Sequence, residues 1–555
     1  MPEPKQPPFL SLPPELIESI TDELDTNAVK DLRLSCKQLG EHLNSRVFRE
    51  LTIGFTQMTY NRELSKVRIL ATTDCHAASS GTRTLRITSL SPTYDPGYPG
   101  PSLRNVGGEW VYDPIPEDPP ETRVAEEELK GYLFKAIASL RSVHSVEWKP
   151  ANKDAEWAQK DVMAALKTLH NLRVLNVETG HFKFPLPIHD LSNIQEISVH
   201  DTSTNYSTQI FDNLAKLVSR NPKITSIDIA GSSRYSVDPI DKNPSLHWIF
   251  ENYPQKSSPL RLHQLSLTYC FLKLDSVTLP HLQHLTSLSL ITIQEPYSRR
   301  VRWRSDGASD LERSKEKLAY GSSLDDVWKA LKLSRIYLQE LVLDVVVPSL
   351  LDYLASYSGL KKLWIIPGIF RDGSSSDSMA SQFFLSTSFI NHVQSLEDLS
   401  ITAIYEGFWC FGPWNEGVIS RCTKLKALKM AIVSVQLYPP EDADGERNVI
   451  DLLIDAVSNS MPQLETLVIS TANAEGLRGA TCGNPAMQHF ARVCRNIVSS
   501  INEYRAPPSC HRLPRLIAGN DTGRAFVPRG PDEDGRLGYL DTTPSSRDYG
   551  SFRFF

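Results

Sequence analysis

Apolar residues recur along most of the chain in one pattern, φ-x-x-φ-x-φ, in which φ is apolar and x is any residue. From about residue 140 the pattern recurs in eleven copies, from Val143-x-x-Val146-x-Trp148 to Leu464-x-x-Leu467-x-Ile469. Its last two apolar residues have the two-residue period of a strand that buries one face. From the copy that begins at Leu172, successive copies start 22 to 53 residues apart, so the chain contains an irregular repeat.

The segments between these strands have the apolar spacing of helices. They are 157–169, 211–218, 324–331, 350–357 and 449–457. Strand and helix in alternation favour a parallel sheet with right-handed crossovers. Because one such unit cannot bury its own apolar face, the units are expected to stack into an α/β solenoid with inner parallel strands and outer helices. An ordinary open α/β domain is the alternative.

The segment before the repeats has a different pattern. Apolar residues recur at helical spacing from Leu16 to Leu24, which predicts an amphipathic helix that begins near Pro13, a residue suited to a first helical turn. A second apolar series from Val29 to Leu51 predicts two further short helices. So small a unit buries little apolar surface by itself and is expected to complete its core against a partner.

The segment contains, in order, Leu12-Pro13-Pro14-Glu15-Leu16, Ile20, Leu24-Asp25, Leu32, Leu34 and Cys36-Lys37. With these residues it resembles an F-box, the helical motif by which substrate adaptors dock onto the Skp subunit of Skp–cullin–F-box ubiquitin ligases. It implies that Skp, and through it cullin, is a partner. The residues expected to bind Skp are apolar ones that the small module leaves uncovered: Leu12, Pro13, Leu16, Ile17, Ile20, Leu24, Leu32 and Leu34. The alternative interpretation is a helical cap on the domain that follows.

The repeats resemble the leucine-rich repeat family in its irregular fungal and plant F-box versions. That resemblance implies an F-box-like three-helix module followed by an irregular leucine-rich-repeat solenoid. A target protein would then bind the strand face, where residues between and just after the apolar positions project outward. The candidates for this contact are Asn176, His200, Asp228, Thr268, Asp344, Trp364, Thr402 and Lys429.

Changes in composition along the chain suggest the domain boundaries. The expected segments are a disordered N-terminus over 1–8, the helical module over 9–55, a connector over 56–139 with a Pro/Gly-rich loop at 91–120, the repeat array over 140–504 with a polar insertion at 295–322, and a disordered tail over 505–555.

Composition indicates neither a nucleic-acid nor a membrane partner. The chain has 59 Lys and Arg against 65 Asp and Glu, a formal charge of −6, and it has no apolar run of spanning length and no secretory signal. The eight cysteines contain no C-x-x-C pair, which fits a reducing compartment, the cytoplasm or the nucleus. The only His pair with metal-like spacing, His281-x-x-His284, lacks the acidic partner of a metalloprotease motif.

These patterns lead to a functional hypothesis without cofactor, metal or catalytic residues. The chain is expected to be a non-catalytic adaptor that holds Skp through the helical module and a protein substrate through the repeats. The runner-up is a repeat-based interaction scaffold that acts independently of ubiquitin ligases. An enzyme whose site is assembled from distant residues is the third possibility.

Overall fold

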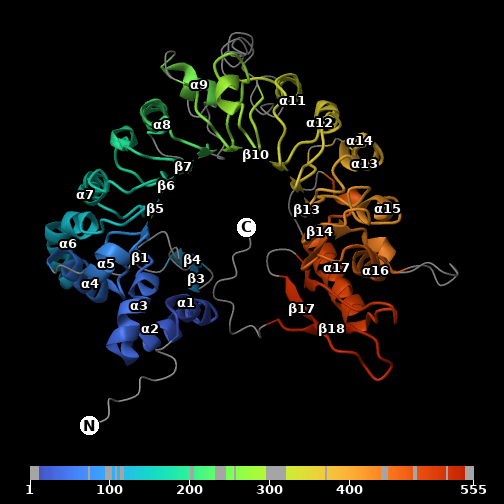
Figure 1. Ribbon diagram of the computed structural model, residues 1–555, viewed down its shortest axis with the longest axis horizontal. Helices are drawn as coiled ribbons and strands as arrows, with labels where there is room; N and C mark the ends of the chain where they lie inside the picture. Colours follow the sequence, from blue (N-terminus) through green and yellow to red (C-terminus); the bar gives the residue numbers. More distant parts are fainter. Residues whose placement is uncertain are drawn as a thin grey trace. The chain divides into compact units, whose positions relative to one another are not determined.

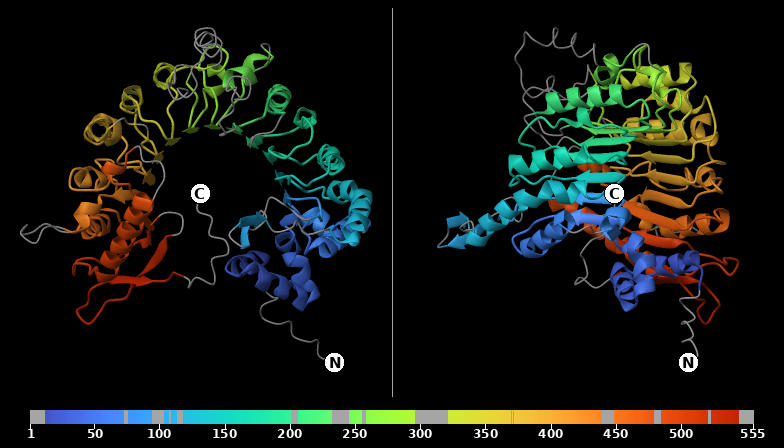
Figure 2. Two further views of the ribbon diagram at one scale, coloured as in Figure 1. Left: turned by 180° about the vertical axis from the view of Figure 1, so that it is seen from behind. Right: turned by 60° about the vertical axis from the view of Figure 1, so that its left-hand side comes forward.

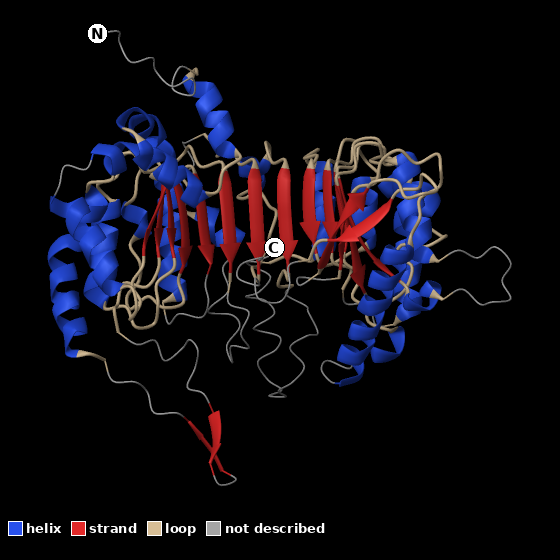
Figure 3. Cartoon of the chain, turned by 90° about the horizontal axis from the view of Figure 1, so that it is seen from below, coloured by secondary structure: helices blue, strands red, loops and turns tan. Residues whose placement is uncertain are grey.

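The computed structural model describes residues 12–72, 76–93, 103–106, 109–112, 118–200, 206–231, 245–254, 258–295, 321–368, 370, 372–438, 448–478, 484–519 and 523–543. The chain forms two compact units. Unit 1 comprises Met1–Leu262 and Tyr269–Phe271, and unit 2 comprises His263–Thr268 and Leu272–Phe555. In each unit strands form one layer and helices cover one of its faces (Figures 1 and 3), which confirms the α/β fold built from strand–helix repeats.

Unit 1 carries a parallel sheet in the order β1-β2-β5-β6-β7-β8. Its register stacks equivalent apolar residues into two rows, one through Val146 and the other through Trp148 of β5, and both side chains are fully buried. The strands are β1 (Glu50–Ile53), β2 (Thr84–Ile87), β5 (Ser145–Trp148), β6 (Val174–Glu178), β7 (Glu196–His200) and β8 (Ser226–Ala230). Each row is continuous because each strand contributes one residue to it.

The helices of unit 1 fall into two groups: the first three precede β1, and the later ones lie between strands along the chain and cover one face of the sheet (Figure 2). They are α1 (Pro14–Asp22), α2 (Thr26–Ser35), α3 (Lys37–Val47), α4 (Tyr60–Thr72), α5 (His76–Gly81), α6 (Pro120–Ala138), α7 (Glu156–Leu166), α8 (Ser207–Arg220) and α9 (Leu246–Glu251). The segments expected to be helical at 157–169 and 211–218 correspond to α7 and α8. The three helices expected before residue 55 are α1 to α3.

Unit 2 continues the same strand–helix alternation. Its sheet order is β9-β10-β11-β12-β13-β14-β15-β16-β17-β18. The strands are β9 (Gln264–Thr268), β10 (Ser287–Ile291), β11 (Glu340–Leu343), β12 (Lys362–Ile365), β13 (Asp398–Ile401), β14 (Ala427–Ile432), β15 (Thr466–Thr471), β16 (Arg515–Ala518), β17 (Arg524–Arg529) and β18 (Gly538–Asp541). All eleven copies of the sequence pattern therefore contain a strand, β5 to β15.

The helices of unit 2 include the three segments expected from periodicity, which are α11, α12 and α16. The helices are α11 (Leu324–Leu333), α12 (Pro348–Leu354), α13 (Gly373–Leu385), α14 (Thr387–Ile390), α15 (Glu416–Ile419), α16 (Val449–Ser460) and α17 (Asn484–Glu503). Across the described part of the chain, no helix is long and apolar enough to cross a membrane.

Two expected boundaries are wrong at the ends of the array. The connector over 56–139 contains β2, which pairs in parallel with β1 and β5, so the repeats begin near residue 50 rather than 140. Residues 505–519 and 523–543 do not form a disordered tail, because β16 extends the parallel sheet and β17 and β18 add antiparallel strands. Residues 1–8 and 544–555 lie outside the described residues.

The loop expected at 91–120 contains an antiparallel hairpin of β3 (Leu103–Val106) and β4 (Glu109–Tyr112). Its last residue, Pro120, is the first residue of α6. Most of the polar insertion expected at 295–322 lies outside the described residues.

The contribution of the C-terminal strands to the stability of the core can be tested by substitution. Phe526 of β17 is fully buried, whereas Leu540 of β18 is 53% exposed. Replacing Phe526 with alanine removes a buried ring and leaves a cavity, so the free energy of unfolding should fall by about 3–5 kcal/mol. Leu540→Ala, the matched control, should change it by less than about 1 kcal/mol. Urea denaturation of the full chain measures both, and equal small effects would restore the disordered-tail interpretation.

Candidate functional site

The first candidate surface belongs to the module formed by α1, α2 and α3. Ile17, Val29, Leu39 and Leu43 form its buried core, each no more than 5% exposed. Four side chains pack around this core and are only partly buried: Leu12, Leu32, Cys36 and Val47. The three helices therefore enclose a small apolar cluster, and most of the remaining apolar surface faces outward.

Polar contacts hold the three helices in place without covering the outer surface. The Asp25 carboxylate caps α2 by accepting hydrogen bonds from the backbone N–H groups of Asn27 and Ala28, both at 2.8 Å. The Arg46 guanidinium of α3 donates to the Asp22 carboxylate at 2.5 Å and to the Thr21 hydroxyl at 2.9 Å, which ties α3 to α1. The orientation of α1 is thus fixed before any partner binds.

The outer face of α1 carries an apolar stripe. Leu16 is 50% exposed, Ile20 is 42% exposed, and Leu24, just beyond the helix, is 38% exposed. The four-residue spacing of Leu16 and Ile20 places them on one side of the helix, and Leu24 follows at the same interval just past its end. Leu34, on α2, is 75% exposed. Burying the three residues of the stripe would stabilise a complex by several kcal/mol before the entropic cost of association.

The residues expected to bind Skp divide into exposed and buried groups. Pro13, Leu16, Ile20, Leu24 and Leu34 are exposed, as the docking hypothesis requires. Ile17 is not, and this expectation is wrong. It lies one position after Leu16, a rotation of about 100° around the helix, which turns it into the module's core.

Leu12 and Leu32 lie between these two groups. Both are half-buried and pack against the module's own core. They therefore support the exposed stripe from behind, and only part of each side chain is available to a partner.

The second candidate surface is the strand face of unit 1, where charged side chains form pairs across neighbouring strands. Arg86 lies 3.1 Å from Glu50 and 3.0 Å from Glu147, so one guanidinium bridges two carboxylates. Lys149 forms an ion pair with Glu178. These charges are neutralised within the unit itself. Since every member of these pairs is at least 32% exposed, the pairs add little to stability.

Ser198, His200 and Asp228 meet on the same face. Oδ2 of Asp228 accepts hydrogen bonds from Nε2 of His200 at 2.7 Å and from the Ser198 hydroxyl at 2.9 Å. The hydrogen bond to Asp228 is the main cause that raises the pKa of His200, and burial opposes it. The imidazole is therefore held in its charged form to a higher pH than an ordinary histidine.

This cluster lacks the geometry of a nucleophilic triad. In such a triad the serine donates to one imidazole nitrogen and the carboxylate accepts from the other. Here Nε2 of His200 faces both partners, at 3.1 Å from the Ser198 hydroxyl. While this nitrogen donates to Asp228 it cannot take a proton from Ser198, so the arrangement suits binding rather than nucleophilic attack.

The strand face of unit 2 holds the third candidate surface, centred on Trp364. The alternating burial of β12 places Trp364 on the same side as Lys362, opposite the buried Leu363 and Ile365. The indole Nε1–H donates to the Asp398 carboxylate at 2.9 Å, and the Lys362 ammonium lies 3.9 Å from the ring centroid. These contacts fix the orientation of the half-buried indole, which projects outward from the strand as the sequence pattern predicted.

The residues expected to contact a substrate all project from the strand face and are half-buried. They do not form one cluster, because three belong to unit 1 and five to unit 2. Those of unit 1 are Asn176, His200 and Asp228, and those of unit 2 are Thr268, Asp344, Trp364, Thr402 and Lys429. Asp344 is occupied locally, since its carboxylate accepts from the Thr292 backbone N–H at 2.9 Å and from its hydroxyl at 3.1 Å.

The histidine pair noted for its spacing does not converge on a metal. His281 is buried, and burial lowers its pKa to about 4, whereas His284 is exposed and lies near His263. Among the residues that the structure describes, no group of three His, Cys, Asp or Glu side chains is placed to hold a metal ion.

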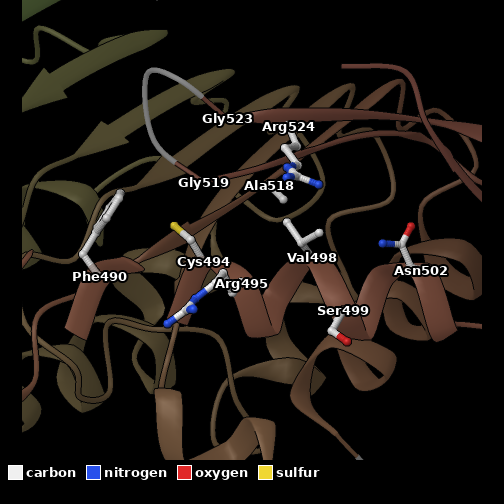
Figure 4. A pocket seen from close by; sticks show the side chains of 10 residues that line it. All are labelled: Phe490, Cys494, Arg495, Val498, Ser499, Asn502, Ala518, Gly519, Gly523 and Arg524. Carbon is white, nitrogen blue, oxygen red and sulfur yellow. The ribbon is translucent and has the colours of Figure 1, made fainter. Parts of the chain in front are cut away.

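A hollow of about 500 Å³ lies between α17 and the strands β16 and β17 (Figure 4). Its lining includes Phe490, Cys494 and Val498 of α17, with Ala518 and Arg524 from the strands. Burial raises the pKa of the Cys494 thiol, which disfavours the thiolate required of a nucleophile. Arg524 also donates to Asp541 at 3.2 Å, so this guanidinium already has a partner outside the hollow's lining.

Sequence reasoning did not find the hydrogen bond that joins Ser198 to Asp228, and it did not name Val468 and Ile517, which extend the outward row that contains Lys429. The period-two alternation around Leu467 and Leu516 would have identified the last two. The Glu406–His489 contact, at 3.1 Å and almost fully buried, joins residues 83 positions apart and leaves no local sequence signal.

The His200–Asp228 pair predicts a pH-dependent contribution to stability. A histidine whose pKa is raised in the folded state stabilises that state below its unfolded pKa, and the contribution is lost as pH rises through the folded pKa. Asp228→Asn should therefore cost more stability at pH 6 than at pH 9, by less than about 1 kcal/mol for so exposed a pair. An NMR titration should show a lower His200 pKa in the variant, and an unchanged pKa would contradict the pairing.

Comparisons with known proteins add only a distant structural likeness. No family model and no curated protein matches the sequence. One solved structure, "Crystal structure of TLR13-ssRNA13 complex", aligns over 88% of this chain and 61% of that chain, with 13% identity and a TM-score of 0.28. This chain therefore spans less than two thirds of that chain's length. The chain's own mostly parallel sheet and its strand–helix repeats are consistent with a leucine-rich-repeat solenoid.

Proposed function

We propose that the chain is a substrate-recognition adaptor of a Skp–cullin–F-box ubiquitin ligase. The observation that carries the proposal is the apolar stripe of Leu16, Ile20 and Leu24, exposed on a module that already has its own core. A helix that presents such a stripe is the form in which an amphipathic segment enters an apolar partner surface. The F-box resemblance names Skp as that partner.

The repeat array supplies the second half of the function. Its strand faces carry half-buried polar, charged and aromatic side chains on regular backbone, which suits recognition of another protein. The adaptor would contribute proximity rather than bond making, since it raises the effective concentration of target lysines near the ligase's catalytic subunits. The chemistry would reside in those other subunits.

A second candidate function has one observation in its favour. α3 packs against α5, and β1 follows α3 after two residues, so the three N-terminal helices also cover the end of the sheet in unit 1. A cap of this kind would serve a repeat-based scaffold that acts independently of ubiquitin ligases. The two candidates differ in whether the outer face of α1 is used.

Charge placed on the apolar stripe separates them. In the double variant Leu16→Asp/Ile20→Asp, two desolvated carboxylates would oppose docking, so the affinity for purified Skp should fall by at least about 100-fold. Both positions are exposed, so the fold should be retained. Isothermal titration calorimetry measures the binding, and circular dichroism of the full chain checks the fold.

The matched control is Leu333→Asp, which places the same charge at an 84% exposed leucine of α11. It should bind Skp like the unaltered chain. Saturable binding that the double variant retains, or no binding by the folded unaltered chain, would favour the scaffold.

A further inference from the structure

One row of outward residues crosses the strand face of unit 2 from β12 to β16. The parallel register aligns Trp364, Ser400, Lys429, Val468 and Ile517 in this order, one residue from each strand. All five side chains are half-buried. The row therefore has an aromatic residue at one end, a cation in the middle and aliphatic residues at the other end.

Further apolar side chains enlarge both ends of this row. Near Trp364, Ile366 and Ile404 are each 38% exposed, and both continue the outward alternation of β12 and β13. Beyond Ile517, the antiparallel register continues with Ala525, and the neighbouring outward pair is Val527 and Leu540. Exposed apolar surface at both ends is the part of the row that gains most from being covered.

The charge in the middle of the row is not neutralised by its neighbours. Lys429 forms no ion pair with any residue of the described ranges, and its neighbours in the row are a serine and a valine. The carboxylate of Asp398, on the adjacent strand β13, already accepts the Trp364 indole hydrogen bond.

The strand face of unit 1 has the opposite character. Its cations Arg86 and Lys149 are paired with carboxylates of the same face. A charged partner would have to break those pairs before it formed new ones, whereas a carboxylate opposite Lys429 would form a pair without breaking any described one. Charge complementarity therefore favours unit 2 for an acidic ligand.

Strand spacing sets the length of that ligand. Lys429 lies two strands from Trp364 and two strands from Ile517, and neighbouring strands are about 4.8 Å apart, so each interval is about 10 Å. A segment in the polyproline II conformation covers about 9 Å in three residues and returns every third side chain to the same side. An acidic residue opposite Lys429 would thus have its apolar neighbours three positions away on each side.

We propose that this row binds a segment of a partner protein in the polyproline II conformation with the pattern apolar-x-x-acidic-x-x-apolar, its carboxylate on Lys429 and its apolar residues near Trp364 and Ile517. This assignment rests on the proposed function, in which the repeat array binds the substrate protein. It adds the class of substrate segment that the array would bind. A nucleic acid is disfavoured because its affinity requires several phosphate contacts, whereas the row contains one cation, Lys429, and the nearby Lys362 ammonium lies against the Trp364 ring.

A charge exchange tests the proposal with the full chain. The probe is a fluorescein-labelled peptide of eleven residues with leucine at its third and ninth positions, glutamate at the sixth, and glycine or serine elsewhere. A second peptide has lysine in place of the glutamate. Fluorescence anisotropy should show tighter binding of the glutamate peptide to the unaltered chain.

Lys429→Glu should weaken the glutamate peptide by at least about tenfold and tighten binding of the lysine peptide. A variant that merely misfolded would lose both peptides and gain neither. Ile517→Asn should weaken both peptides by similar factors, because it removes apolar surface and leaves the central charge unchanged.

The matched control is Lys424→Glu, an exposed lysine in the turn before β14, which should leave the preference for the glutamate peptide unchanged. Equal affinity for the two peptides, no binding of either, or a preference that Lys429→Glu does not reverse would overturn the proposal. Skp binding, measured on the same preparations, is independent of these outcomes. Its loss would reject the adaptor function while leaving the peptide site intact.

Discussion

The alternation of buried and outward residues along parallel strands is the constraint on which the structure depends. In each unit the register places equivalent apolar residues side by side, in rows that cross the sheet. In unit 2 one row passes through Leu399 of β13 and another through Ile401. From β9 to β15 every member of these two rows is buried. A shift of one residue in a single strand would bury Lys429 or Trp364 and expose a leucine. The apolar rows thus fix both the core and the identity of every side chain on the strand face.

The register forces one residue of each strand outward at every second position, and the two units place different kinds of side chain there. In unit 1 opposite charges face each other across strands, and the surface is electrostatically satisfied before anything binds. In unit 2 the central row combines a cation with aromatic and aliphatic side chains and leaves them half-buried. The α1 helix resembles the second case, since polar contacts through Arg46 fix its position while its apolar stripe faces outward. Exposed apolar groups on fixed backbone are preorganised for binding.

The sequence pattern predicted the strands β5 to β15 because each copy has a large apolar residue in all three positions. It missed β2, whose first position is Thr82, and β16, whose last is Ala518. It also missed β1, although Phe48-x-x-Leu51-x-Ile53 fits the pattern, because the apolar series up to Leu51 was assigned to helices. Helical periodicity predicted α1 but not its orientation. The apolar face has four residues, and their spacing does not show which of them face the core. Ile17 proved to be the core residue. Contacts such as Ser198 with Asp228 depend on register between strands and have no signature within either one.

The central claim is that the chain binds a partner through the outer face of α1 while the array remains available to a second protein. Hydrogen–deuterium exchange of the full chain, with and without purified Skp, tests this claim most directly, because it locates the contact along the sequence. The account predicts slower exchange in peptides that cover α1 and α2, and unchanged exchange in β9 to β16. Unchanged exchange over α1 and α2 at saturating Skp, or protection confined to the strands, would contradict it.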